Sequence, residues 1–93
     1  MPQSLPPLSS LRAFEAVVRL GSVTAAAVEL GRTHGAVSKQ LRALQDHLGA
    51  PLFVRAGARL TPTGQGAALA AAVREGLDAI TTGYRAVEAQ LSA

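Results

Sequence analysis

The sequence predicts a mainly α fold made of three short helices, a small two-stranded hairpin and one long C-terminal helix. Apolar residues recur every three or four positions in three segments, as they do on the buried face of a helix, and glycine or proline bounds the segments. Only residues 50–61 break this period, with a short apolar and partly β-branched run. The 93 residues are enough for one small domain with one core and an extension.

The first two helices are expected over residues 10–20 and about 23–30. Ser9 is a plausible N-cap for the first, and a glycine directly after it is a plausible stop. Ser22 can cap the second helix, because its hydroxyl can accept a hydrogen bond from a backbone N–H one turn on. Phe14, one of three aromatic residues in the chain, is expected to anchor the core.

A third helix is predicted from Thr33 to Gly49, with the threonine as N-cap and the glycine as C-cap. Its apolar residues recur at helical spacing and define one face, made of Val37, Leu41, Leu44 and Leu48. Polar or basic residues lie between them and project elsewhere, namely Ser38, Lys39, Arg42 and Gln45. An ordinary amphipathic surface helix would show the same pattern as a helix that binds DNA. The neighbouring segments must therefore decide between these two interpretations.

The second and third helices are spaced as a helix-turn-helix over about residues 23–42. Ala27, Gly31 and Val37 supply a small residue in one helix, a glycine in the turn and an apolar residue in the next helix. The glycine permits the turn, and the small alanine lets the two helices pack closely. An Ala-rich helix without this role is the alternative.

Residues 52–60 predict a small basic hairpin, or wing, with its turn at Ala56 and Gly57. A lone hairpin is marginally stable in water, so its apolar residues must pack against the helices. Arg55 and Arg59 lie near its tip, where each could contact a DNA phosphate. The alternative is a solvated pair of arginines.

Almost all of the chain after Thr61 is predicted to form one long helix of roughly 30 residues, or about 45 Å. Thr61 is expected to cap it, with Pro62 at its first helical position. Its apolar residues follow a seven-residue repeat that one small domain cannot bury alone, so we expect this helix to pair with a second copy in a homodimer. Packing of the stripe against its own domain is the alternative. The expected dimerisation residues are Val73, Leu77, Ile80, Tyr84, Val87 and Leu91.

Composition argues against several classes of function. The chain has no Cys, two His and no apolar run close to the roughly 20 residues of a membrane span. Residues 1–7 contain three prolines, are expected to form a flexible lead and lack the features of a secretion signal. His34 and His47 have no acidic partner at a recognisable spacing. We therefore expect a soluble, cytoplasmic protein that is not an enzyme and uses no metal or cofactor.

Positive charge is concentrated in the middle of the chain. The net charge is +3, from nine Lys or Arg and six Asp or Glu. Residues 32–59 carry five of the basic residues and one of the acidic residues, a charge of +4, which leaves −1 for the rest. Such a basic segment is the footprint of a surface that binds a polyanion, although many basic clusters are only solvated surface.

Six short motifs occur together in this chain. They are Leu11-x-x-Phe14, Gly21-Ser22, Ala26-Ala27-x-x-Leu30, Ala36-Val37-Ser38, Leu48-Gly49-x-x-Leu52-Phe53-x-Arg55 and Leu60-Thr61-Pro62-x-Gly64. Through them residues 5–66 resemble the N-terminal winged helix-turn-helix of LysR-type transcriptional regulators. The following helix resembles the linker helix of that family.

The resemblance implies sequence-specific binding of double-stranded DNA by a bacterial regulator. It places the third helix in the major groove of a pseudo-palindromic promoter site and the wing near the adjacent minor groove. The base-reading and groove-facing positions of the family are occupied here by His34, Gly35, Ser38 and Lys39. Its backbone-contacting positions are occupied by Thr33, Arg42 and Arg55. Arg32 replaces a frequently apolar residue and could add a phosphate contact, as Arg59 could.

The implied organisation is a DNA-binding domain over residues 6–63 and a linker and dimerisation helix over residues 64–93. The C-terminal effector domain of the family, which would bind an effector ligand and complete a tetramer, is absent from these residues. A helical protein-interaction module is the alternative function. Salt distinguishes the two, because DNA binding weakens steeply with salt and apolar helix pairing does not.

Overall fold

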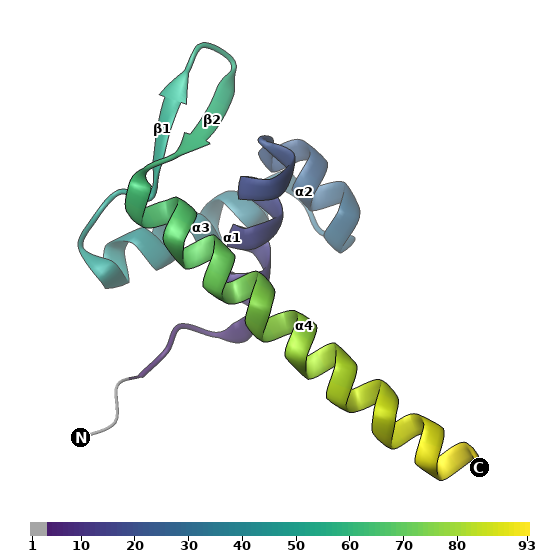
Figure 1. Ribbon diagram of the computed structural model, residues 1–93. Helices are drawn as coiled ribbons and strands as arrows, with labels where there is room; N and C mark the ends of the chain where they lie inside the picture. The colour runs from purple at the N-terminus through teal and green to yellow at the C-terminus, as the bar shows by residue number, and fades with distance from the viewer. Residues whose placement is uncertain (1–3) are drawn as a thin grey trace.

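The computed structural model describes residues 4–93 and confirms a mainly α fold with a two-stranded wing and a long final helix (Figure 1). The elements follow in the order α1 (Leu8–Leu20), α2 (Val23–Leu30), α3 (His34–Leu48), β1 (Phe53–Ala56), β2 (Arg59–Pro62) and α4 (Gly64–Ser92). Residues 1–3 of the predicted lead, with Pro2 among them, lie outside the described residues.

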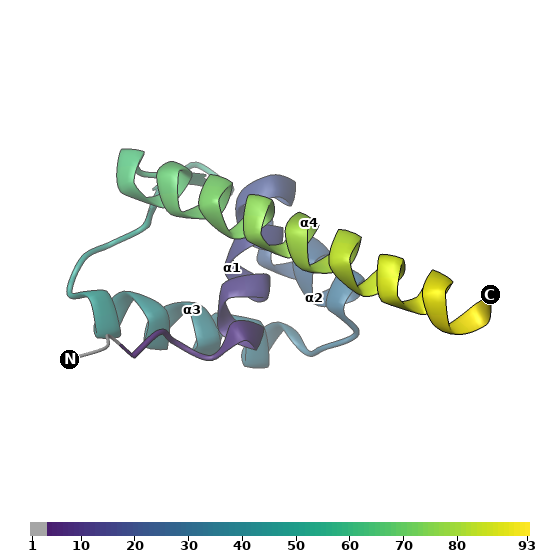
Figure 2. The same cartoon turned by 60° about the horizontal axis from the view of Figure 1, so that its bottom comes forward.

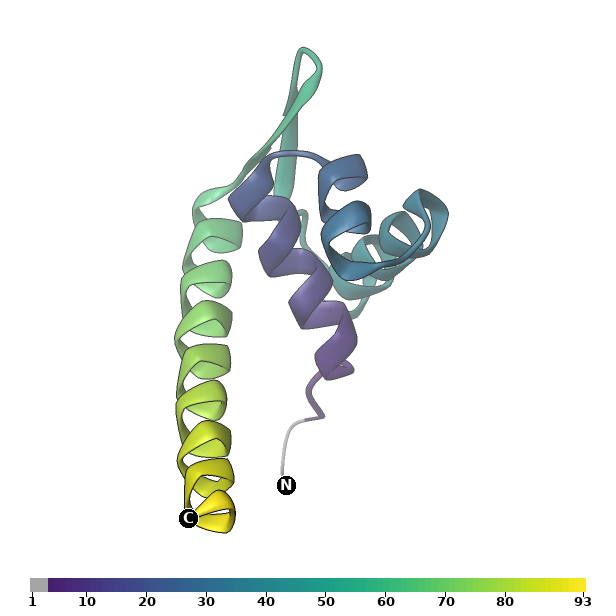
Figure 3. The ribbon, with the colours of Figure 1, turned by 90° about the vertical axis from the view of Figure 1, so that its right-hand side faces the viewer.

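Helix α1 forms the centre of the fold. It contacts α2, α3 and α4, and α3 and α4 lie on opposite sides of it (Figures 2 and 3). The largest fully buried side chains come from α1, α3 and the segment before the wing, and they are Phe14, Leu44, Leu52, Val17 and Val37. The ring of Phe14 packs edge-on against Phe53 of β1, with 5.4 Å between centroids. The base of the wing is therefore attached to the helical core, as expected.

The predicted caps of α2 and α3 are confirmed. The Ser22 hydroxyl accepts a hydrogen bond from the N–H of Ala25, and the Thr33 hydroxyl accepts one from the N–H of Ala36, each at 3.1 Å. Helices α1, α2 and α3 each end at a glycine with a φ between 66° and 74°, a backbone conformation that other residues rarely adopt. These glycines are Gly21, Gly31 and Gly49.

The prediction that Ser9 caps α1 is wrong, because the helix begins one residue before it. Pro7 occupies the cap position, and its carbonyl accepts hydrogen bonds from the N–H groups of Ser10 and Leu11 at 3.0 and 3.3 Å. The Ser9 hydroxyl instead accepts a hydrogen bond from Nε2 of Gln40, at 3.3 Å. Ser9 therefore links α1 to α3.

The wing continues past its predicted end. Its strands pair antiparallel, from Phe53 with Pro62 at the base to Ala56 with Arg59 near the tip. The turn consequently lies at residues 57–58, one position later than expected, and its glycine has a φ of 62°.

Helix α4 begins at Gly64, so the prediction that Thr61 caps it and Pro62 opens it is wrong. Both residues pair with β1 and have a strand conformation. Thr63 is the N-cap instead, since its hydroxyl accepts a hydrogen bond from the N–H of Gly66 at 3.0 Å. Pairing across the wing therefore overrides the local helix signal at these two positions.

The first half of α4 packs on the domain and the second half extends beyond it (Figures 1 and 3). Ala70, about one turn before the first predicted residue of the repeat, is buried, and Val73 and Leu77 are half-buried. The later members are 52–81% exposed, namely Ile80, Tyr84, Val87 and Leu91. The domain thus covers the start of the stripe and leaves its end open. Across residues 4–93, no helix has the length and apolar character needed to cross a membrane.

Candidate nucleic-acid interface

Helix α3 buries one face against the core and presents the others. Val37, Leu41 and Leu44 are at most 6% exposed, as the spacing predicts. Leu48 lies on the same helical face but is 52% exposed, so the core does not cover this end of it. It belongs to the last turn of α3, which runs past the core before the chain turns at Gly49.

The outward face of α3 is basic over its first turns. At about 100° per residue, Gly35, Lys39 and Arg42 project on the side opposite Val37, and all three are exposed. Asp46 follows one turn after Arg42 on the same face and is also exposed. A phosphate backbone would therefore meet positive charge along the first half of α3 and a negative charge near its end.

His34 and Ser38 lie on one flank of this outward face. They are four residues apart, which places them one above the other on the helix. His34 is exposed and Ser38 is half-buried. Thr33 precedes them, and the N-terminus of α3 carries a partial positive charge and N–H groups outside the helical ladder. The structure therefore gathers the predicted base-reading residues in the first two turns of α3.

Arg32 lies apart from this group. Its Nη1 donates a hydrogen bond to Oε1 of Gln40 at 2.6 Å, and Gln40 in turn donates to Ser9 of α1. Gln40 and Ser38 are two residues apart and therefore lie on nearly opposite sides of α3. A phosphate contact by Arg32 would thus fall on the flank of α3 that faces the start of α1.

Arg55 and Arg59 are both exposed on the wing but belong to opposite faces of it. Arg55 is paired with Leu60, and successive side chains of a strand alternate, so Arg59 projects from the other face. The Arg59 guanidinium covers Gly21, because a Cβ at that glycine would lie 2.8 Å from Nη2 of Arg59. The structure therefore directs Arg59 to the junction of α1 and α2 and does not bring the two arginines together.

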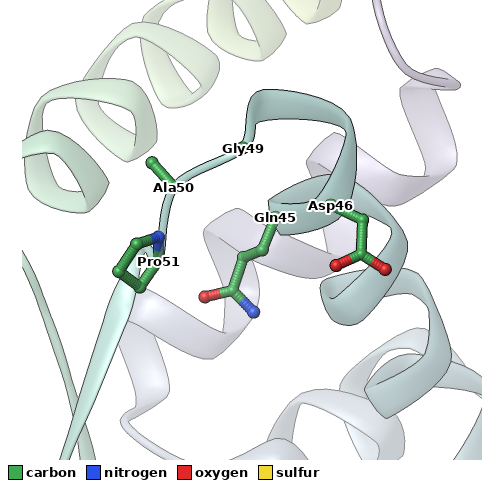
Figure 4. A pocket seen from close by; sticks show the side chains of 5 residues that line it. All are labelled: Gln45, Asp46, Gly49, Ala50 and Pro51. Atoms are coloured by element: carbon green, nitrogen blue, oxygen red, sulfur yellow. The ribbon is translucent and has the colours of Figure 1, made fainter.

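Gln45 fastens α3 to the wing, a role that the sequence did not indicate. Its Oε1 accepts a hydrogen bond from the N–H of Leu52 at 2.8 Å, and its Nε2 donates to the carbonyl of Leu41 at 3.3 Å. Gln45 borders an open hollow of about 440 Å³ at the end of α3, and its side chain and that of Asp46 leave the helix in different directions (Figure 4). The other lining residues are Gly49, Ala50 and Pro51. This hollow is remote from the first two turns of α3.

A helix-turn-helix whose second helix exposes a basic face, followed by an antiparallel wing, defines the class of winged helix-turn-helix DNA-binding domains. The pattern of the family described as "Bacterial regulatory helix-turn-helix protein, lysR family" matches residues 8–67, well over half of the chain. The chain belongs to this LysR family.

The curated relatives are named as transcriptional regulators. Over 66 residues the chain is 53% identical to the HTH-type transcriptional regulator TrpI of Pseudomonas aeruginosa. These aligned residues are 69% of this chain and 22% of that protein. Over 75 residues it is 45% identical to the HTH-type transcriptional activator AmpR of Rhodobacter capsulatus, covering 81% of this chain and 26% of that protein. The chain thus spans about a quarter of the length of these relatives.

Solved structures that contain DNA share the fold. The complex of the BenM DNA-binding domain with catB site 1 DNA has a TM-score of 0.85 and 26% identity, covering 94% of this chain and 97% of that one. The complex of the CbnR DNA-binding domain with DNA has a TM-score of 0.76 and 29% identity, covering 90% and 98%. The similarity to these domains includes most of α4 as well as the helix-turn-helix and the wing.

Proposed function

We propose that this chain binds double-stranded DNA sequence-specifically, as the DNA-binding module of a bacterial LysR-type transcriptional regulator in the cytoplasm. One observation carries the proposal. The first two and a half turns of α3 present Gly35, Lys39 and Arg42 on one exposed face, with no acidic residue among them. In this assignment residues 6–63 form the DNA-binding domain and residues 64–93 form the linker helix.

Base reading falls to the first two turns of α3. The major groove is about 12 Å wide and admits an α-helix, and the exposed face of α3 is the one that would enter it. The Lys39 ammonium can donate to guanine O6 and N7, and Ser38 and His34 lie beside it on the flank. Gly35 has no side chain, so the backbone at the start of α3 can approach the bases closely.

Backbone contacts would set the register of the domain on DNA. Contacts to phosphate fix position and orientation but carry no sequence information. Thr33, Arg42 and Arg55 are the first candidates, since all three are exposed at or beside α3 and on the wing. Arg59 would contact a phosphate near the junction of α1 and α2, where its guanidinium covers Gly21. Arg32 would contact a phosphate on the flank of α3 where it donates a hydrogen bond to Gln40.

The distal half of α4 supports a homodimer. An open apolar groove of about 250 Å³ lies between the start of α1 and α4, and Leu5 and Leu8, which line it, are 79% and 52% exposed. A second copy would fill this groove with exposed residues from the end of its own stripe, Tyr84, Val87 and Leu91. Twofold symmetry would then cover both grooves and hold two α3 helices for two half-sites. In a full-length protein such dimers would pair as a tetramer.

The same exposed stripe favours a second candidate function, a helical protein-interaction module in which the basic face has no role. Salt separates the candidates. The affinity for DNA falls steeply as the salt concentration rises, because the protein must displace counterions from the phosphates when it binds, and added salt opposes their release. Pairing of apolar helices is nearly insensitive to salt.

The experiment that tests the proposal is selection from a random duplex pool at near-physiological salt, followed by sequencing of the retained DNA. We expect enrichment of two half-sites related by a dyad at fixed spacing. Lys39→Ala should weaken binding to the selected site by about 1–3 kcal/mol, whereas Arg85→Ala, which removes an equal charge from the distal part of α4, should not. Failure of the wild type to enrich any sequence would refute sequence-specific binding.

A further inference from the structure

Four charged side chains tie α4 to the helix-turn-helix through α1, and we call them the charge network: Glu15, Arg19, Glu29 and Arg74. The Glu15 side chain is only 9% exposed, and a carboxylate that is nearly buried needs charged partners. Arg19, one turn later in α1, donates to both its oxygens at 2.9 and 3.2 Å. Arg74 of α4 donates to the same carboxylate at 3.4 Å.

The network also reaches α2. The Arg19 guanidinium donates to both oxygens of Glu29, with 3.0 Å from Nη1 to Oε1. One guanidinium therefore joins a carboxylate of α1 to a carboxylate of α2, and the α1 carboxylate is shared with α4. These contacts run between helices on different sides of α1 (Figure 3).

Arg74 contacts α1 at a point where α4 is no longer packed against the domain on all of its inner side. Closer to its start, α4 is fixed by Gly66, where a Cβ would lie 2.1 Å from the carbonyl oxygen of Leu52, and by the buried Ala70. Beyond Ala70, one side of α4 faces the open apolar groove described above. Arg74 lies on another side, with Ala71, against Glu15 and Val18 of α1. The ion pair thus restrains α4 on the side away from the groove.

A small change in the direction of α4 would have a large effect at its end. About 27 Å of helix follows Arg74, since α4 ends at Ser92 and rises 1.5 Å per residue. A rotation of about 10° at this point would move the end of the helix by about 5 Å, which exceeds the rise of about 3.4 Å per base pair of DNA. If α4 carries the dimer contact, its angle sets the separation of the two α3 helices.

We propose that Arg74 is a positioning residue, which fixes through Glu15 the angle between α4 and the DNA-binding domain and thereby the half-site spacing that the dimer accepts. The proposal rests on the function proposed above, because it requires two domains joined through α4. It assigns Arg74 no contact with DNA, since α4 and α3 lie on opposite sides of α1 (Figure 2).

The test compares Arg74→Gln with Arg85→Gln, which removes the same charge from α4 at a position with no ion pair among the described residues. Affinity is measured for the selected site, for versions with one base pair added or removed between half-sites, and for a single half-site. The spacing penalty is the ratio of the affinity for the selected site to the affinity for a site of altered spacing. We expect this ratio to shrink by up to about fivefold in Arg74→Gln. That factor corresponds to about 1 kcal/mol at 1.4 kcal/mol per tenfold, which is the upper range for an exposed ion pair. Single half-site affinity should match that of Arg85→Gln.

An unchanged spacing penalty in Arg74→Gln would overturn the positioning role and leave the proposed function standing. An equal loss on every DNA, single half-site included, would overturn it too, because it would indicate a purely structural role. A wild type that selects no paired half-sites would overturn the proposed function itself.

A second measurement needs no DNA: spin labels at Thr24→Cys and Glu88→Cys report the distance between α2 and α4 in a chain that has no native Cys. That distance distribution should broaden in Arg74→Gln, with excess unlabelled protein present, and an unaltered distribution would contradict the proposal.

Discussion

Replacement of Gly66 by alanine probes the junction between the wing and α4. A Cβ there would lie 2.1 Å from the carbonyl oxygen of Leu52, so the backbone must move. The same oxygen accepts a hydrogen bond from the N–H of Thr63 at 3.0 Å. Overpacking costs about 1–3 kcal/mol and a lost hydrogen bond about 1 kcal/mol, while alanine returns up to about 1 kcal/mol through helix propensity. We expect Gly66→Ala to lower the free energy of unfolding by about 1–3 kcal/mol.

Thermal and urea unfolding followed by circular dichroism, at one protein concentration, measure this change. In a domain of this size 1 kcal/mol corresponds to roughly 4–8 °C in Tm, so Tm should fall by at least about 4 °C. Gly83→Ala is the matched control, because no atom lies within 4 Å of a Cβ at that position of the same helix. The control should be as stable as the wild type or more stable by up to about 1 kcal/mol. An unfolding free energy for Gly66→Ala equal to that of the control would refute the reasoning.

Two further predictions concern single side chains. Gln45→Ala leaves the N–H of the buried Leu52 without its acceptor, so we expect the urea midpoint to fall by the equivalent of about 1–3 kcal/mol; a midpoint like that of the wild type would show that the hydrogen bond contributes little. A hydrogen bond from Arg19 holds the pKa of Glu29 below its ordinary value of 4.5. A lowered pKa adds stability that is fully present above about pH 4.5 and is lost as pH falls through the folded-state value, so Glu29→Gln should be less stable than the wild type at pH 7, and this difference should be smaller at pH 3. An equal difference at both pH values would contradict the ion pair.

Local signals were sufficient for most helix boundaries. Ser22, Thr33 and Gly49 act within one turn of their own position, so their roles could be read from the sequence. Ser9 and Thr61 also carry local cap signals, but the Pro7 carbonyl and the pairing with β1 decide their conformation. Both depend on neighbours that spacing alone does not reveal.

The positions of candidate site residues were predicted better than their contacts. Lys39 and Arg42 are exposed because helical period fixes the face on which they lie. The position of Arg59 over Gly21 depends on how the wing lies against α1, which strand patterns do not specify. The pair of Glu15 and Arg74 joins residues 59 positions apart, and no local motif predicts such a contact.

The most direct test of the central claim, that α3 reads bases, is to repeat the duplex selection with His34→Gln. We expect the preferred base to change at one position in each half-site, with half-site spacing and the other positions retained, because glutamine presents a donor and an acceptor together where neutral histidine presents them on different sides. An identical consensus would place His34 outside the groove. A consensus altered at many positions would mean that the start of α3 affects the site through the fold and does not read it.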